Sequence, residues 1–281
     1  MKVTKNLNAL SEIEFLSIFG SIFEKSEWVA SKTYQLKPFN DQELNSVVRN
    51  LLALKSQEKE LKQLNEYITD GVMKRYLPPT VIDQILSGKL SMDKPAQMQR
   101  ITILFSDIDG FTRASEEIGP EKIADFLNSY LSKMNEVIFN FGGTIDKFMG
   151  DAIMVMFGAP GAMSDKDQAR KAVNCALAMQ EAMTGITTAM EKENQVNLKM
   201  RIGIHQGEAV VGNFGSNQRK DYTAIGPNVN LASRIESCCE PGEVFVSKEV
   251  STLLDEHAAE QVGVFELKGI PAGKPLFRIA S

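Results

Sequence analysis

The sequence predicts an α+β domain over residues 93–281, preceded by a helical segment over residues 1–50 and a helical linker over residues 51–92. In the C-terminal part, short runs rich in β-branched and aromatic residues alternate with longer helical segments. Their strand–helix–strand–strand–helix–strand order is typical of a largely antiparallel sheet with helices covering one face. The first ninety residues show helical periodicity instead, which sets them apart from the domain.

The elements of the domain can be placed from local signals. Eight segments have strand character: ITILFSDI, GTIDKF, AIMVMF, LKMRIGIH, AVVGNF, DYTAIG, EVFVS and PLFRI. Helix starts are signalled at Pro120, near Asp165 and after Pro227. Met149 and Gly150 separate two strands by a tight turn, so a hairpin is expected there.

The N-terminal residues read as short amphipathic helices followed by a longer one. Apolar residues at helical spacing mark the first part: Leu10, Phe15, Leu16, Phe19 and Phe23. A heptad-like seam follows, formed by Val47, Leu51, Leu54, Leu61, Ile68 and Val72 and interrupted by Glu58 and Asn65. This pattern favours a weak coiled coil between two copies of the chain. A single solvated helix packed on its own domain is the alternative.

Composition limits the possible partners and the compartment. The chain carries 31 basic and 36 acidic side chains, a net charge of −5, so neither nucleic acid nor an anionic membrane is expected as a partner. Three cysteines are too few for a disulfide framework. The N-terminus has polar residues where a signal peptide needs an apolar core. These observations favour a cytoplasmic location.

Two aspartates occupy positions suited to cations and phosphates. Asp107 lies at the end of a hydrophobic strand, before a turn at Gly110, and Asp151 follows the Met149-Gly150 turn. Two such aspartates on neighbouring strands can hold a pair of Mg²⁺ ions for displacement at phosphorus. Alone, each is also what an ordinary turn would contain.

Asn230 and Arg234 lie four residues apart on the helix expected after Pro227, and therefore on one face of it. An arginine suits the charge that develops in phosphoryl transfer, and an asparagine can orient a sugar. No histidine is placed as a general base, since His205 lies within a strand and has the character of a structural residue.

Three motifs together resemble the catalytic domain of class III adenylyl and guanylyl cyclases. They are FSDIDGFT, KFMGDAIMVMFGAP and YTAIGPNVNLASRIES, in this order, and the resemblance covers nearly all of residues 99–281. It implies a ferredoxin-like βαββαβ fold and conversion of ATP to 3′,5′-cyclic AMP. It also implies two Mg²⁺ ions per site, which Mn²⁺ can replace, and a head-to-tail homodimer. Asp109 departs from the motif only where the family is variable.

The resemblance also implies a role for each matching residue. Asp107 and Asp151 match the metal ligands, and Lys147 and Thr223 match the pair that reads adenine. Asn230 would orient the ribose, Arg234 would stabilise the pentavalent phosphorus, and Lys268 would contact the triphosphate. The backbone that would cradle the triphosphate runs through Ile108, Asp109, Gly110, Phe111 and Thr112.

Other readings remain at this point. A guanylate cyclase is the nearest, and Lys147 disfavours it because guanine presents the reversed pattern of donors and acceptors. A degenerate domain that only binds nucleotide would be expected to lack one of the site residues. A diguanylate cyclase would carry Gly-Gly-(Asp/Glu)-Glu-Phe, whereas residues 142–146 read Gly-Gly-Thr-Ile-Asp.

The first 40 residues are similar to the start of the ureidoimidazoline decarboxylases of urate breakdown, over LNALSEIEFLSIFGSIFEKSEWVASKTYQLKPF. That family works with a histidine downstream of this segment, and the first histidine of this chain is His205. The similarity therefore implies at most a helical scaffold and no second activity.

Overall fold

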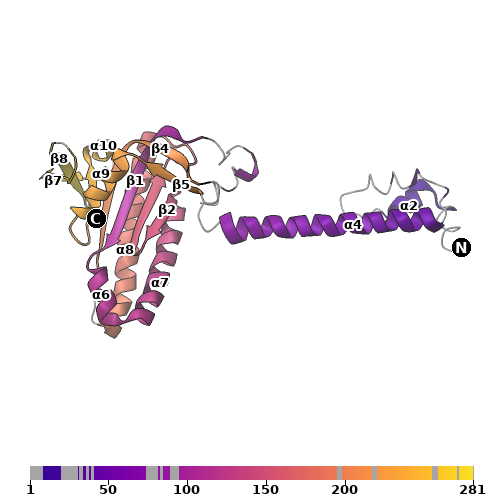
Figure 1. Cartoon of the computed structure of the whole chain (residues 1–281), viewed down its shortest axis with the longest axis horizontal. Coiled ribbons are helices and arrows are strands. Elements are labelled where there is room, and N and C mark those ends of the chain that lie inside the picture. The colour runs from indigo at the N-terminus through magenta and orange to yellow at the C-terminus, as the bar shows by residue number, and fades with distance from the viewer. Residues whose placement is uncertain are drawn as a thin grey trace. The chain divides into compact units, whose positions relative to one another are not determined.

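The structure is a computed structural model that divides into two compact units, Met1–Thr69 and Asp70–Ser281. It describes residues 9–19, 31, 34–35, 38, 41–73, 82, 85–88, 95–194, 198–216, 220–254, 259–270 and 272–280. Figure 1 shows the helical first unit and the second unit, which contains the sheet. Within these ranges, no helix is both long and apolar enough to cross a bilayer.

The first unit contains the helices expected from the N-terminal periodicity. Helix α2 spans Glu12–Phe19. It begins with a capping box, in which the Glu14 backbone N–H donates to Ser11 Oγ (3.3 Å) and the Ser11 N–H donates to Glu14 Oε2 (2.8 Å). Phe15 is buried and its ring lies 5.7 Å from that of Tyr34. A helical scaffold is therefore present here, while Trp28 and Phe23 lie outside the described residues.

Helix α4 spans Asp41–Glu66 and continues as one π-helical turn over Tyr67–Val72. The helix runs through residue 50 without a break, so the expected boundary there does not coincide with the end of an element. Three seam residues seven positions apart are exposed within the chain: Leu54 (57 %), Leu61 (60 %) and Ile68 (43 %). The coiled coil remains a prediction, and an exposed apolar row is what it requires.

The second unit is built on an eight-stranded sheet with the order β2-β3-β1-β4-β6-β8-β7, and β5 pairs with β4 outside this order. The strands are β1 (Gln97–Ile108), β2 (Thr144–Met149), β3 (Ala152–Phe157), β4 (Met200–Gly215), β5 (Lys220–Ile225), β6 (Val244–Ser247), β7 (Ala259–Phe265) and β8 (Lys274–Ile279). Strands β4 and β6 are parallel, and every other pairing of described strands is antiparallel. The predicted α+β class and the hairpin at Gly150 are thus confirmed.

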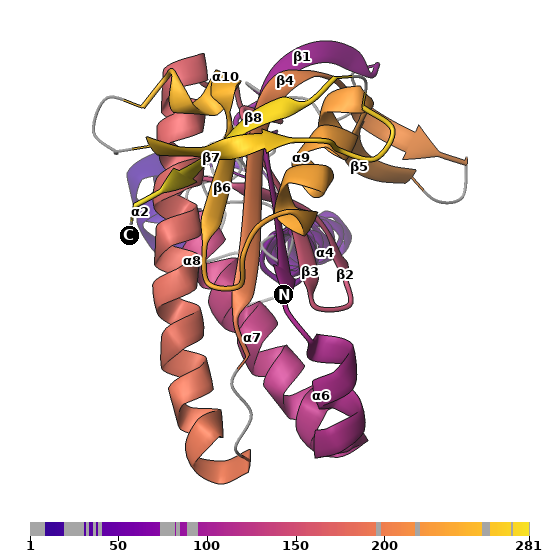
Figure 2. The ribbon, with the colours of Figure 1, turned by 90° about the vertical axis from the view of Figure 1, so that its left-hand side faces the viewer.

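The helices α7 (Pro120–Asn140), α8 (Asp165–Asn194) and α9 (Pro227–Ser237) begin where the sequence indicated. The unit also contains α6 (Phe111–Ile118) and the short α10 (Lys248–Ser251). The expectation that helices cover one face of the sheet is wrong. Helices α7 and α8 pack with Leu104 and Ile108 of β1, whereas α9 packs with Ile103 and Phe105, which point to the opposite face. Figure 2 shows α8 and α9 on opposite sides of β4.

Helix α9 lies unusually close to β4 because two glycines remove the side chains between them. A Cβ atom at Gly203 would lie 2.1 Å from the backbone nitrogen of Glu236, and one at Gly207 would lie 2.5 Å from the Asn228 side chain. Both contacts are far inside van der Waals distance. The position of α9, and with it of the site residues that it carries, therefore depends on these glycines.

We expect Gly203→Ala to lower the free energy of unfolding by about 3 kcal/mol, because the methyl group must displace helix backbone. Gly185→Ala is the matched control, since Gly185 is exposed within α8 and has open space around its Cβ position. That change should leave stability equal or higher by about 0.5–1 kcal/mol. Urea unfolding followed by circular dichroism measures both, and equal stabilities for the two variants would contradict the close contact.

Candidate active site

The two predicted metal ligands lie next to each other. Strand β1 pairs with β3 in a register that sets Ser106 opposite Ile153, so the end of β1 meets the turn that contains Asp151. The Ile108 N–H donates to Asp151 Oδ2 (3.0 Å), which fixes this carboxylate against the strand end that carries Asp107. Burial, and then the negative charge of Asp107, raises the pKa of Asp151 to about 6.

A cation from the protein itself compensates part of this negative charge. Arg201 is the cross-strand partner of Asp107 on β4, and its Nη2 lies 2.7 Å from Asp107 Oδ2. The same guanidinium lies 3.6 Å from Asp109 and 3.3 Å from Glu236 of α9. Burial raises the pKa of Glu236 to about 7, although Arg201 opposes the shift. Arg201 and Glu236 were not predicted as site residues, because their place follows from strand register and helix packing.

The chemistry of these side chains fits a hard divalent cation. The described residues contain no group of three or more His, Cys, Asp or Glu side chains that could hold a metal ion. A cation at Asp107 and Asp151 would therefore take its other ligands from backbone, water or a bound phosphate. Mg²⁺ is typically held in this way, by one or two carboxylates together with water and substrate phosphates.

Two backbone N–H groups of the loop expected to cradle a triphosphate already donate hydrogen bonds to other parts of the chain. The Ile108 N–H donates to Asp151, and the Asp109 N–H donates to the Lys199 carbonyl (2.8 Å). The chain then turns through Gly110 in the left-handed region (φ 70°) and enters α6 at Phe111. The N–H groups available to a phosphate are therefore those at the start of α6, including Phe111 and Thr112, where the helix dipole also favours an anion.

The proposed base-reading residues lie together in one chain. Thr223 is 6 % exposed on β5, and Lys147 of β2 lies opposite Met154, which faces α9. Between them is Asp146, whose side chain is 1 % exposed. The Thr223 hydroxyl donates to Asp146 Oδ2 (2.5 Å), and Lys147 Nζ lies 3.6 Å from Asp146 Oδ1. Burial raises the pKa of Asp146, while Thr223 and Lys147 oppose the shift.

The remaining predicted residues face solvent. Asn230 and Arg234 are exposed on α9, and Lys268 is exposed in the turn after β7. Within the described part of the chain, none of the three side chains has a hydrogen-bond or ion-pair partner. They are therefore free to contact a ligand or another chain.

His205 has a structural environment, as its sequence position suggested. It is 2 % exposed on β4, with Nδ1 2.8 Å from Ser247 Oγ and Nε2 3.0 Å from Asn228 Oδ1. Burial lowers its pKa. Both ring nitrogens are occupied in fixing α9 and α10 to the sheet, so the imidazole is unavailable as a base.

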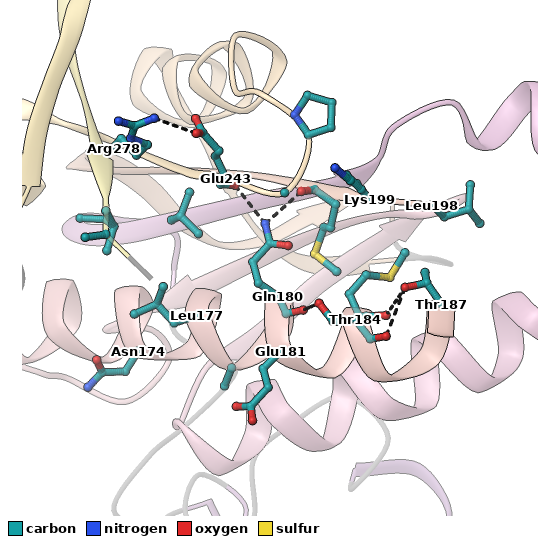
Figure 3. A pocket seen from close by; sticks show the side chains of 18 of the residues that line it. Asn174, Leu177, Gln180, Glu181, Thr184, Thr187, Leu198, Lys199, Glu243 and Arg278 are labelled. Carbon is teal, nitrogen blue, oxygen red and sulfur yellow. Dashed lines mark hydrogen bonds and ion pairs between the residues drawn. The ribbon is translucent and has the colours of Figure 1, made fainter. Parts of the chain in front are cut away.

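A hollow of about 1210 Å³ lies elsewhere, along α8, and contains none of the predicted site residues. Figure 3 shows Gln180 of α8 reaching across it toward the strands. Its Nε2 donates to the carbonyls of Met200 (2.9 Å) and Glu243 (3.0 Å). This contact anchors α8 to the start of β4, one residue before Arg201.

Comparison with known families identifies the domain. The family model described as the adenylate and guanylate cyclase catalytic domain matches residues 94–278. The chain belongs to this family. The match takes in the strands and helices that carry Asp107, Lys147, Asp151, Thr223, Asn230 and Arg234.

Curated relatives of this cyclase domain include two adenylate cyclases and a peptide receptor. Adenylate cyclase 1 of Rhizobium meliloti is 35 % identical over 57 % of this chain and 24 % of its own length. An adenylate cyclase of Anabaena cylindrica is 41 % identical over 50 % of this chain and 28 % of its own length. Human atrial natriuretic peptide receptor 2 is 30 % identical over 83 % of this chain and 23 % of its own length. The chain thus spans about a quarter of the length of these curated relatives.

Two solved structures match the domain over nearly their whole length. The adenylyl cyclase CyaB from P. aeruginosa is 39 % identical, with a TM-score of 0.66, and the match covers 67 % of this chain and 97 % of CyaB. The guanylyl cyclase Cya2 is also 39 % identical, with a TM-score of 0.63, over 67 % of this chain and 95 % of Cya2. Equal identity to an adenylyl and a guanylyl cyclase means that overall similarity does not decide the substrate of this cyclase domain.

Proposed function

We propose that this chain is an adenylate cyclase, which converts ATP to 3′,5′-cyclic AMP and pyrophosphate. The observation that carries the proposal is the Asp107–Asp151 pair, held together by the Ile108 N–H within a cyclase-family domain. In this reaction the ribose 3′-hydroxyl attacks the α-phosphorus in line, and pyrophosphate leaves from the opposite side. The reaction needs no protein nucleophile, so binding, orientation and charge are what the residues supply.

Asp107 and Asp151 would hold two Mg²⁺ ions per site, or Mn²⁺ in their place, and two such ions neutralise phosphate charge and favour the ionised 3′-hydroxyl. Arg201 lies beside this pair and would share the charge of the triphosphate once cations neutralise Asp107. The backbone of Ile108 to Thr112 would hold the phosphates mainly through the start of α6. We infer a cytoplasmic location, because the proposed substrate ATP is available there and because the three cysteines are free thiols.

The choice of ATP over GTP follows from Lys147 and Thr223, the residues proposed to contact the base. The Lys147 ammonium can only donate hydrogen bonds, which suits the unprotonated N1 of adenine and opposes the N1–H of guanine. Thr223 is the nearby residue that would meet the group at carbon 6 of the base. The pair therefore supports adenine, which a comparison of whole domains leaves undecided.

The sites would be shared across a head-to-tail homodimer. Asn230, Arg234 and Lys268 are exposed, and each lacks a partner among the described residues of its own chain. In the proposed dimer they join Lys147 and Thr223 in completing a site whose metal ligands come from the other copy. Asn230 would orient the ribose, Arg234 would stabilise the charge at phosphorus, and Lys268 would contact the triphosphate.

The assay of purified chain with ATP or GTP, and with Mg²⁺ or Mn²⁺, tests this function. We expect cyclic AMP from ATP and, at equal concentration, at least about tenfold less cyclic GMP from GTP, since reversed hydrogen-bond patterns are strongly rejected. Chromatography of both cyclic nucleotides and of pyrophosphate gives the readout. A preference for GTP would make the chain a guanylate cyclase, and binding without either product would make it a regulatory nucleotide-binding domain.

A further inference from the structure

The carboxylate of Asp146 is buried beside the two base-reading residues and has no role in the function proposed above. Its side chain is 1 % exposed, and its Oδ1 atom lacks a hydrogen-bond partner among the described residues. A buried ionisable group of this kind needs a reason, because burial of a carboxylate is unfavourable.

A break in strand register explains how Asp146 reaches this place. The pairing of β2 with β3 shifts between Ile145 and Lys147, so an extra residue is inserted at this point of the ladder. A bulge removes the strict alternation of side chains and re-aims a residue that would otherwise face the other side. Asp146 can therefore lie beside Lys147, its neighbour in sequence, instead of pointing away from it.

The contact with Thr223 has a defined direction. A threonine hydroxyl carries one hydrogen and two lone pairs, so a free one can either donate to a base or accept from it. An ionised carboxylate can only accept. The Thr223 hydroxyl gives its hydrogen to Asp146 Oδ2 at 2.5 Å, and its alternative acceptor, the Ala224 carbonyl, is 3.5 Å away. What the Thr223 oxygen can still offer to a base is a lone pair.

We propose that Asp146 is a positioning residue that determines base specificity, because it takes the Thr223 hydrogen and leaves Thr223 able only to accept. An acceptor at this point bonds the 6-amino group of adenine and repels the 6-oxo group of guanine or hypoxanthine. The inference rests on the proposed function, which assigns Thr223 to the base. It explains how a hydroxyl, neutral in itself, discriminates between an amine and a carbonyl.

The effect of a substitution of Asp146 on base preference should therefore depend on how far it allows the Thr223 hydroxyl to donate its hydrogen to the base. Asp146→Ala frees the hydroxyl to accept from or donate to the base. Asp146→Asn goes further, because the Lys147 ammonium near Oδ1 draws the amide oxygen and turns the amide NH₂ toward Thr223. Thr223 then accepts from Asn and donates to the base, which favours a 6-oxo group.

The experiment compares ATP with inosine triphosphate, which differs from it in the base at positions 1 and 6. Lys147 meets position 1 in every variant, so changes in the ratio of kcat/KM report on position 6. We expect the preference for ATP to fall by about tenfold in Asp146→Ala and by more in Asp146→Asn. Purine riboside triphosphate, which has no group at carbon 6, should be turned over almost equally by all three proteins.

A Thr223→Val background is the matched control. If Asp146 acts through the hydroxyl, Asp146→Asn should not change the ratio of ATP to inosine triphosphate once that hydroxyl is absent. An equal change in both backgrounds would mean that Asp146 acts through Lys147 or the fold, and would overturn the proposal. An unchanged ratio in the parent background would overturn it as well.

Two further measurements keep the test decisive. If Asp146→Asn does not fold, two variants of Thr223 take its place. Thr223→Ser should keep the ATP preference of the parent chain, and Thr223→Val should lose it. Equal ratios of ATP to inosine triphosphate turnover in these two variants would contradict a fixed acceptor at this position. Dissociation constants of ATP and inosine triphosphate, from calorimetry, give the same ratio without turnover. Absence of cyclic AMP from the parent would thus overturn the proposed function alone, while an unmoved binding ratio would overturn the inference.

Discussion

Replacing either Asp107 or Asp151 by asparagine is expected to lower kcat with ATP by more than about 100-fold. Loss of a residue that merely supports a metal ligand costs roughly 10–100-fold, so loss of a ligand should cost more. Asparagine keeps the side-chain volume and can still accept the Ile108 N–H at position 151. The fold should therefore remain. Cyclic AMP formation over a range of Mg²⁺ concentrations measures the effect, and excess Mg²⁺ should restore part of it.

Folding can be separated from activity in these variants. Because burial and the charge of Asp107 raise the pKa of Asp151, its ionised form is disfavoured in the folded state, and neutral asparagine should not lower the melting temperature at pH 8. Asp125→Asn on the exposed side of α7 is the control for loss of one acidic charge and should keep full activity. Undiminished turnover by either site variant would remove the metal assignment.

Two inactive variants are expected to restore activity when their chains mix. In a closed two-fold dimer with shared sites, Asp107→Ala and Arg234→Ala place both lesions in one site and leave the other intact. Random mixing makes about half of the dimers mixed, each with one good site of two, so activity should recover to roughly a quarter of the wild-type value. A cyclic AMP assay of the whole co-expressed mixture measures this recovery, and mixed dimer purified through a different affinity tag on each chain should reach about half of the wild-type value.

The matched control is a mixture of Asp107→Ala with Asp151→Ala. Both lesions then lie in the metal-binding half, so every site of a mixed dimer is damaged and no recovery is expected. Recovery of activity in this control would mean that the activity does not come from an intact shared site. No recovery with Arg234→Ala, once mixed dimers are shown to be present, would mean that each chain holds a complete site.

The fold was predictable where local signals are strong. Pro120 and Pro227 start helices because proline fits the first helical position, and both helices begin there. The strand β7 was missed, since its burial is irregular and Gly263 interrupts it. The prediction that all helices cover one face of the sheet was also wrong for α9, because helical periodicity identifies an apolar stripe without saying which side of the sheet it packs against.

The candidate site divides in the same way. Asp107 and Asp151 were found because a carboxylate at a strand end or a hairpin turn is visible in the sequence. Arg201 was missed because its place opposite Asp107 depends on strand register, which a sequence does not state. Asp146 was missed for a related reason, since the irregularity between Ile145 and Lys147 decides where it points.

The β2–β3 hairpin has a consequence for how the two sites of the proposed dimer would behave. Lys147 lies on its first strand and Asp151 in its turn, only four residues apart along one short ribbon. If the sites are shared as proposed, these two residues serve different nucleotides. A base that binds Lys147 in one site would then shift the β2–β3 hairpin, which also carries Asp151, a metal ligand of the other site. Binding of the first ATP would therefore change the affinity for the second, so that the enzyme would respond to ATP cooperatively rather than as two independent catalysts.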